Sequence, residues 1–186
     1  MKNIYCIVGP SGSGKTTVSK ILERDYGLNL VESYTTRPPR YPDEEGHIFV
    51  SDEEFDALGE MCAYTEYDGH RYGVTPEVID QNDIYVIDPF GVKYLRKHYH
   101  GRKNVVAIRL SVDEDTRMQR MADRGDSSDK IADRIMQDGR SFFLEGIDDI
   151  DEIYEMRYQM LVPNYDSELT ARCIATFIGC WEKSND

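Results

Sequence analysis

The stretch that decides the fold is Gly9-Pro10-Ser11-Gly12-Ser13-Gly14-Lys15-Thr16. It matches the pattern G-x-x-x-x-G-K-[ST] in full, and its glycines let backbone N–H groups converge on phosphate oxygens. Lys15 would neutralise charge on the β- and γ-phosphates of a nucleotide, and the Thr16 hydroxyl would join the shell of a Mg²⁺ ion. We therefore expect a loop that binds ATP with Mg²⁺; the alternative is a chance glycine-rich turn before a helix.

The residues on either side of this loop supply the context that it requires. Asn3 to Val8 reads as a buried strand, and a helix is expected from Lys15 to Tyr26, with Gly27 as its stop. The residues that would share the buried face of this helix are Val18, Ile21, Leu22 and Tyr26. Strand, loop and helix in this order favour a phosphate-binding loop over a chance turn.

Later segments continue an alternation of strands and helices. Ile84–Asp88 and Asn104–Leu110 read as core strands, and Val92–His98 between them suits a helix. The remaining expected elements are a helix around Phe142–Met160, a strand near Leu161-Val162 and a terminal helix from Ser167 to Trp181. This order predicts an α/β protein with a central parallel sheet.

The segment from Ser33 to Asp80 interrupts that alternation. It opens with Ser33-Tyr34-Thr35-Thr36-Arg37-Pro38-Pro39-Arg40, whose prolines rule out a regular helix. Ser51-Asp52-Glu53-Glu54 forms a capping box for a short helix. The short strands expected around it are His47–Val50, Met61–Tyr67 and Arg71–Val74. We interpret the segment as an excursion between two core strands.

Composition narrows the classes of function. The 186 residues carry a net charge of −13, from 35 acidic and 22 basic residues, which disfavours general nucleic-acid binding. No apolar run approaches the length of a membrane span, and the first strand is too short for a signal peptide. The four cysteines form no C-x-x-C pair, so we expect reduced, mostly packed thiols in a cytoplasmic protein without zinc.

Positive groups must hold any phosphate ligand in so acidic a chain. Arg37 and Arg40 lie three residues apart in a proline-rigid loop, where they would clamp a second phosphate or remain two solvated surface arginines. A polar stretch from 117 to 138 surrounds the tip Gly125–Ser128. Its arginines, which would close over a transferring phosphoryl group or form an ordinary solvated helix face, are Arg117, Arg120, Arg124 and Arg134.

Asp88 stands where a core strand is expected to end. Ligand-binding groups in α/β proteins gather at the carboxyl ends of the strands. Its carboxylate would hold Mg²⁺ through water or bind an acceptor substrate, and a plain cap of the strand end is the alternative.

Together these segments resemble guanylate kinases over nearly the whole chain. Ser33–Arg40 is similar to the family's SxTTRxPR segment, which is far more specific than a phosphate loop alone. The other matching segments are Gly9–Thr16, Gly46–Ser51, Tyr64–Thr75, Asp88–Val92, Arg124-Gly125 with Arg134, and Asn164. The resemblance implies a P-loop NTPase three-layer fold with a central parallel sheet, as one domain of residues 1–186. Its parts would be a core (1–32, 82–116 and 139–186), an acceptor-binding insert (33–81) and a lid (117–138).

The resemblance also implies a role for each matching residue. ATP would be bound by Ser11, Gly12, Ser13, Gly14, Lys15, Thr16 and Thr17, with Asn164 near the adenine. A nucleoside monophosphate would be bound by Ser33, Arg37, Arg40, His47, Tyr72 and Asp88. The catalytic residues would be Lys15, Arg37, Arg124 and Arg134, and Thr16 would be the metal ligand. The chain would act as a monomer or a homodimer.

Three positions depart from the family pattern. His47 replaces a phosphate-binding tyrosine, Ala63 replaces the acidic residue that reads the guanine edge, and Val74 replaces a hydroxyl residue that donates to the guanine carbonyl. Glu66 would point to the opposite face of its strand from Ala63. We therefore expect phosphoryl transfer with weak or altered guanine selectivity. GMP or dGMP is the first-choice acceptor; another nucleotide, a phosphorylated ribose, or a non-catalytic binding module is the alternative.

Overall fold

The computed structural model describes residues 2–39, 42–67, 69–142 and 159–184 of the chain. A parallel sheet of four strands in the order β6-β1-β7-β8 forms its centre. The strands are β1 (Asn3–Val8), β6 (Ile84–Val86), β7 (Asn104–Ser111) and β8 (Met160–Pro163). Leu30 adds an isolated parallel bridge to Ile84. The central parallel sheet that the sequence predicts is therefore confirmed.

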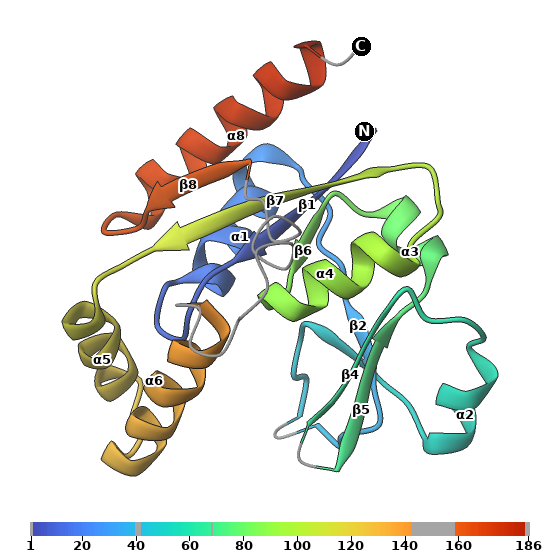
Figure 1. Ribbon diagram of the computed structural model, residues 1–186, viewed down its shortest axis with the longest axis horizontal. Helices are drawn as coiled ribbons and strands as arrows, with labels where there is room; N and C mark the ends of the chain where they lie inside the picture. The colour runs from blue at the N-terminus through green and yellow to red at the C-terminus, as the bar shows by residue number, and fades with distance from the viewer. Residues whose placement is uncertain (1, 40–41, 68, 143–158, 185–186) are drawn as a thin grey trace.

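Every residue of β1 is buried because helices cover both faces of this sheet (Figure 1). On one face α1 (Lys15–Tyr26) and α8 (Ser167–Ser184) pack against each other and against the strands. On the other face lie α4 (Pro89–His98) and α3 (Pro76–Gln81). The fold is thus the three-layer arrangement that was expected.

The ends of the first helices follow from their capping residues. α1 has the predicted bounds, and Gly27 closes it with φ 64° while its N–H donates to the carbonyl of Glu23. Tyr26 is 41% exposed, so the prediction that it lies on the buried face is wrong. α4 begins at Pro89, three residues before the expected Val92, because the side chain of Asp88 caps it. The strand before it ends at Val86 rather than at Asp88.

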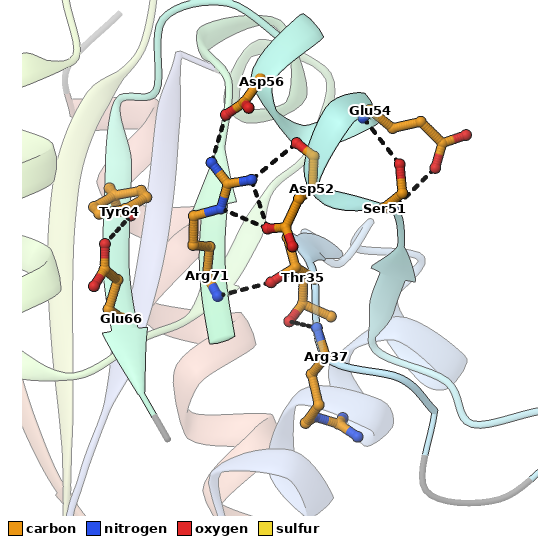
Figure 2. Close-up of polar contacts among 10 residues, drawn as sticks. Thr35, Arg37, Ser51, Asp52, Glu54, Asp56, Tyr64, Glu66 and Arg71 are labelled. Atoms are coloured by element: carbon orange, nitrogen blue, oxygen red, sulfur yellow. Dashed lines mark hydrogen bonds and ion pairs between the residues drawn. The ribbon is translucent and has the colours of Figure 1, made fainter. Parts of the chain in front are cut away.

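Residues 33–74 form a second sheet, in the order β3-β2-β5-β4. Its strands are β2 (Ser33–Thr35), β3 (His47–Phe49), β4 (Ala63–Tyr67) and β5 (His70–Val74). The short helix α2 (Asp52–Ala57) starts with the predicted capping box of Ser51 and Glu54 (Figure 2). Arg71 fastens β5 to α2 through Asp52 and Asp56, at 2.7 and 2.5 Å. This sheet is the predicted excursion.

Two helices, α5 (Glu114–Asp123) and α6 (Ser128–Phe142), form a hairpin beside the central sheet (Figure 1). Gly125 makes the turn between them with φ 91°. The hairpin extends beyond the expected lid limits of 117 and 138. Most of the helix expected at Phe142–Met160 lies outside the described residues.

Two further expectations concern the burial of the cysteine thiols and the presence of a membrane-spanning helix. Cys6 and Cys62 are buried, whereas Cys173 and Cys180 are exposed, so only half of the free thiols are packed. Among the described residues, no helix has both the length and the apolar character needed to cross a membrane.

Candidate active site

The phosphate loop between β1 and α1 has the backbone of a cradle. Gly12 and Gly14 adopt φ values of 74° and 87°, which side chains rarely tolerate. A Cβ on Gly12 would approach the carbonyl oxygen of Arg117 to 2.6 Å, and one on Gly14 would approach Nδ2 of Asn164 to 2.4 Å. The hydroxyl of Ser13 is buried and has no hydrogen-bond partner among the described residues. A loop with free polar groups at a helix N-terminus fits a phosphate ligand.

Lys15 extends from the first turn of α1 back across the loop. Its Nζ donates to the carbonyl oxygens of Gly9 and Pro10, at 2.5 and 3.2 Å. Burial lowers the pKa of Lys15 to about 8, although the carboxylates of Asp138 and Asp88 oppose the shift. Both carbonyl contacts are exchangeable for phosphate oxygens. Lys15 therefore brings to the loop a positive charge that is present below pH 8.

Thr16 and Thr17 follow Lys15 and are exposed at the start of α1. A hydroxyl in this position suits Mg²⁺, which prefers oxygen ligands and retains several waters. The residues present thus fit an ATP–Mg²⁺ group, and Thr16 as a ligand of the ion stays a prediction.

Asn164 supports the phosphate loop from the end of β8. It is completely buried; its Nδ2 donates to the carbonyl of Ser13 at 2.7 Å, and its Oδ1 accepts from Ser167 at 3.3 Å. Arg120 donates to the carbonyls of Gly12 and Asn164, at 3.3 and 2.8 Å. Contact of Asn164 with the adenine of ATP stays a prediction, since its recorded contacts are with the loop and the chain after β8.

Arg117 and Asp138 form a buried pair under the same loop. Arg117 is 1% exposed, and its Nη1 lies 2.9 Å from Oδ2 of Asp138 and donates to the carbonyl of Ser11 at 3.4 Å. Asp138 also accepts from the backbone N–H of Ser11 at 2.9 Å. Arg117 and Arg120 are therefore engaged with loop atoms and a carboxylate rather than lying on a solvated helix face, and their contact with a transferring phosphoryl group stays a prediction. No local pattern marks Asp138, because its partners are over a hundred residues away or on the preceding helix.

Two further arginines of the hairpin, Arg124 and Arg134, lie nearer its tip. Arg124 caps the end of α5 and forms an ion pair with Asp126. Arg134 is exposed on α6. Their contact with a transferring phosphoryl group stays a prediction.

Three acceptor-site candidates meet on the second sheet. Ser33 and His47 are paired in register on β2 and β3, and Oγ of Ser33 lies 2.8 Å from Nδ1 of His47. The ring of His47 lies edge-on to that of Tyr72, with centroids 5.7 Å apart. The replacement of tyrosine by histidine at position 47 thus keeps an aromatic ring against Tyr72.

Arg37 follows β2 and is 9% exposed. Its guanidinium binds both carboxylate oxygens of Glu44, at 2.8 and 3.2 Å, and lies over the ring of Phe49 at 5.4 Å. The hydrogen bonds that Arg37 donates to Glu44 raise its pKa further, so its charge is permanent. Arg40, the second arginine of the expected clamp, lies outside the described residues.

A cavity of about 250 Å³ joins the two sheets at their facing ends. Asp88 lines it while its Oδ1 accepts the N–H of Gly91 at 2.9 Å, so this residue combines a capping role with a position in the cavity. The lining residues are Lys15, Ser33, Ala63, Tyr64, Thr65, Tyr72, Tyr85, Val86, Ile87, Asp88 and Gly91. Lys15 of the phosphate loop and three acceptor-site candidates thus share one space. Tyr85 was not singled out from the sequence.

The two positions at which the family's guanine-contacting residues are replaced are direct neighbours. Ala63 and Val74 are cross-strand partners on β4 and β5, and are 3% and 0% exposed. Glu66 lies on the exposed side of β4, where Tyr64 donates to it at 2.5 Å (Figure 2). The alternation along the strand therefore keeps Glu66 away from the side that Ala63 faces.

Comparisons with known proteins agree with this architecture. A family model described as "AAA domain" matches residues 6–142. The guanylate kinase of Nitrosomonas europaea is 30% identical, covering 96% of this chain and 89% of the relative. The guanylate kinase of Haemophilus influenzae is 31% identical, with coverage of 95% and 86%.

A solved structure shows the same fold at lower identity. The crystal structure of guanylate kinase from Anaplasma phagocytophilum is 21% identical, covers 96% of this chain and 85% of its own, and superposes with a TM-score of 0.58. With a phosphate loop of the expected geometry and relatives similar over nearly their full length, this chain belongs to the guanylate kinase family.

Proposed function

We propose that this protein transfers the γ-phosphoryl group of ATP to the phosphate of a nucleoside monophosphate, giving the diphosphate and ADP. The observation that carries the proposal is the shared cavity: Lys15 lines it together with Ser33, Tyr72 and Asp88. If Lys15 binds the donor phosphates and the others bind the acceptor, two phosphates would lie within reach of each other, which is the main requirement of phosphoryl transfer. GMP or dGMP is the first-choice acceptor.

The reaction needs positioning and charge neutralisation rather than a protein nucleophile. An oxygen of the acceptor phosphate, already ionised near neutral pH, forms the new bond to the γ-phosphorus as the bond to the β–γ bridging oxygen breaks. Lys15 and the N-terminus of α1 would hold the donor phosphates. Bound Mg²⁺, held by Thr16, would neutralise the developing charge. Arg124 and Arg134 would close over the transferring group.

The acceptor end of the site would be formed by the second sheet. Arg37, Arg40, His47 and Tyr72 would bind the acceptor phosphate, and Ser33 and Asp88 would bind its base. Arg37 would have to exchange part of its contact with Glu44 for phosphate oxygens. We accordingly assign residues 33–81 to acceptor binding, 117–138 to the lid and the rest to the core.

An acceptor panel tests this function. Purified protein is incubated with ATP and Mg²⁺ and with GMP, dGMP, AMP, CMP, UMP or ribose 5-phosphate, and nucleoside diphosphate is quantified by chromatography. We expect transfer to at least one nucleoside monophosphate and none by Lys15→Ala, whose fold is checked by circular dichroism. Mg²⁺-dependent ATP binding with no product from any acceptor would instead identify a binding module.

A second candidate function is transfer to a non-guanine acceptor. It is favoured by the apolar pair of Ala63 and Val74, which provides neither the carboxylate nor the hydroxyl of the family pattern. A guanylate preference of several thousand-fold in the panel would exclude this candidate.

A further inference from the structure

The base end of the cavity has lost its usual polar groups on the β4–β5 side. Ala63 contributes a methyl group to the cavity wall, and its cross-strand partner Val74 is fully enclosed in the core behind it. Neither side chain has a hydrogen-bonding atom. A base that enters this space must find its partners at other residues of the cavity, because unpaired polar edges are costly in an enclosed site.

Tyr85 lies across from this apolar pair, at the centre of β6. It pairs in register with Cys6 of β1 and lines the cavity together with Ala63, Thr65 and Asp88. Its side chain is 8% exposed and packs in the hydrophobic cluster that contains Ala63 and Val74. The ring therefore occupies the floor of the space that Ala63 leaves open.

The hydroxyl of Tyr85 makes no hydrogen bond within the part of the chain that the structure describes, and it is not one of the fully enclosed polar atoms there. Buried tyrosine hydroxyls nearly always have one, as Tyr5 does with Glu182 at 2.9 Å and Tyr99 does with Asp80. Burial raises the pKa of Tyr85, so the phenol stays protonated and able to donate. The cavity is the open space that Tyr85 adjoins, so its missing partner would come from there.

We propose that the Tyr85 hydroxyl hydrogen bonds to the base of the acceptor nucleotide, in place of the groups absent at Ala63 and Val74. The inference rests on the proposed function, since it assumes a nucleoside monophosphate in this cavity. Tyr85 donates to a carbonyl or ring-nitrogen acceptor on the edge of the base, and the Asp88 carboxylate next to it accepts an N–H. Tyr85 thus sets selectivity for a base with both groups on one edge.

This arrangement has a specific consequence for purine acceptors. The 2-amino group of guanine is the group that a carboxylate at position 63 would bind. An alanine at this position makes no hydrogen bond to it. Tyr85 and Asp88 read groups that guanine and hypoxanthine share. GMP and IMP are therefore expected to be used with kcat/KM values within about threefold of each other, because no polar contact distinguishes them.

The test is Tyr85→Phe, which removes one oxygen and keeps the ring that fills the floor. Its matched control is Tyr94→Phe on α4, whose ring stacks on His98 at 4.0 Å outside the cavity. Both variants are compared with wild type for turnover of GMP and IMP, for binding of each nucleotide by calorimetry, and for thermal unfolding.

Tyr85→Phe is expected to raise the KM and Kd for the acceptor about fivefold, the range for one neutral hydrogen bond. kcat and the KM for ATP stay unchanged, because the contact is equal in ground and transition states. Tm does not fall, since no internal hydrogen bond is lost. Tyr94→Phe leaves all values as in wild type.

Unchanged acceptor Kd in Tyr85→Phe would overturn the inference, and so would a drop in its Tm, which would reveal an internal partner of the hydroxyl. Wild-type protein that binds GMP and IMP without turnover would refute the transfer reaction alone, and the Kd comparison would still decide the role of Tyr85. Wild-type protein that binds no nucleoside monophosphate would overturn both proposals.

Discussion

Asp138 of α6 accepts a hydrogen bond from the backbone N–H of Ser11 at 2.9 Å, so a carboxylate of the α5–α6 hairpin occupies a donor of the phosphate loop. The same carboxylate is the partner of the buried Arg117. An anion at this place resembles a phosphate in charge and in hydrogen bonding. Nucleotide binding must therefore displace Asp138 or work against its charge.

The substitution Asp138→Asn should raise ATP affinity and lower stability. Loss of the negative charge removes repulsion of the triphosphate, and we expect the Kd for ATP to fall several-fold in calorimetry. Arg117 loses its buried charged partner, which costs about 2 kcal/mol in the free energy of unfolding. Asp133→Asn, at an exposed position of the same helix, is the control. Weaker ATP binding by Asp138→Asn would show that the carboxylate supports the loop instead.

The depressed pKa of Lys15 predicts a pH dependence of ATP use. With a pKa of about 8, the ammonium is charged below pH 8 and increasingly neutral above it. kcat/KM for ATP reports the free enzyme and should fall as pH rises through 8. kcat should fall less, because bound phosphates restore the charged form. Initial rates from pH 6.5 to 9.5 measure both; a flat kcat/KM profile would contradict the prediction.

Asn164 should affect ATP binding by holding the loop. Asn164→Ala leaves the Ser13 carbonyl unpaired and opens space beside Gly14. We expect about a tenfold weaker Kd for ATP, and an unfolding free energy lower by roughly 1–3 kcal/mol. Gly14→Ala should be as severe, since its Cβ would meet the Asn164 amide and its φ is positive. If the effects of Asn164→Ala and Gly14→Ala are coupled, the double variant loses less binding free energy for ATP than the sum of the two single variants.

Much of the fold is predictable from local patterns, and the contacts that shape the site are not. The bounds of β1 and α1 and the capping box at Ser51 follow from neighbouring residues alone. α3 was missed although Thr75-Pro76 is a usable start signal, because the segment was interpreted only as strands and loop.

The missed site residues share a physical reason. Asp138 and Tyr85 matter through partners, or through the lack of one, that only the tertiary arrangement reveals. A tyrosine inside an apolar strand has the same sequence pattern whether its hydroxyl faces a cavity or a core partner. Likewise, nothing local distinguishes Arg117 under the loop from Arg134 on the surface.

Restoring a carboxylate on β4 should restore guanine reading. Ala63→Glu places an acceptor on the cavity wall, and the ratio of kcat/KM for GMP over IMP should rise at least about tenfold. The buried position makes the variant less stable, with an unfolding free energy lower by roughly 1–3 kcal/mol. Ala63→Gln is the control for size. An unchanged GMP-to-IMP ratio would mean that the base binds elsewhere in the cavity.

The last helix is fastened to β1 by a carboxylate with a lowered pKa. Burial opposes ionisation of Glu182, but hydrogen bonds from Asn3 and Tyr5, at 2.8 and 2.9 Å, outweigh it and lower its pKa. Because the pKa of Glu182 is lower in the folded than in the unfolded state, its carboxylate stabilises the fold above the unfolded pKa of about 4.3. This contribution to stability is lost as the pH falls through the folded pKa. The Tm gap between wild type and Glu182→Gln should therefore shrink below pH 4. Glu168→Gln, at an exposed position of the same helix, is the control for the loss of one charge from that helix.

The support of the phosphate loop by Asn164 sets an order of events during synthesis. β1 leaves the ribosome just before the eight residues of the loop, and β6 and β7 follow the loop. Asn164 arrives directly after β8, which joins the edge of the sheet beside β7 and is the last strand of that sheet to be made. Because chains fold as they emerge, the loop is complete long before its support by Asn164 can form.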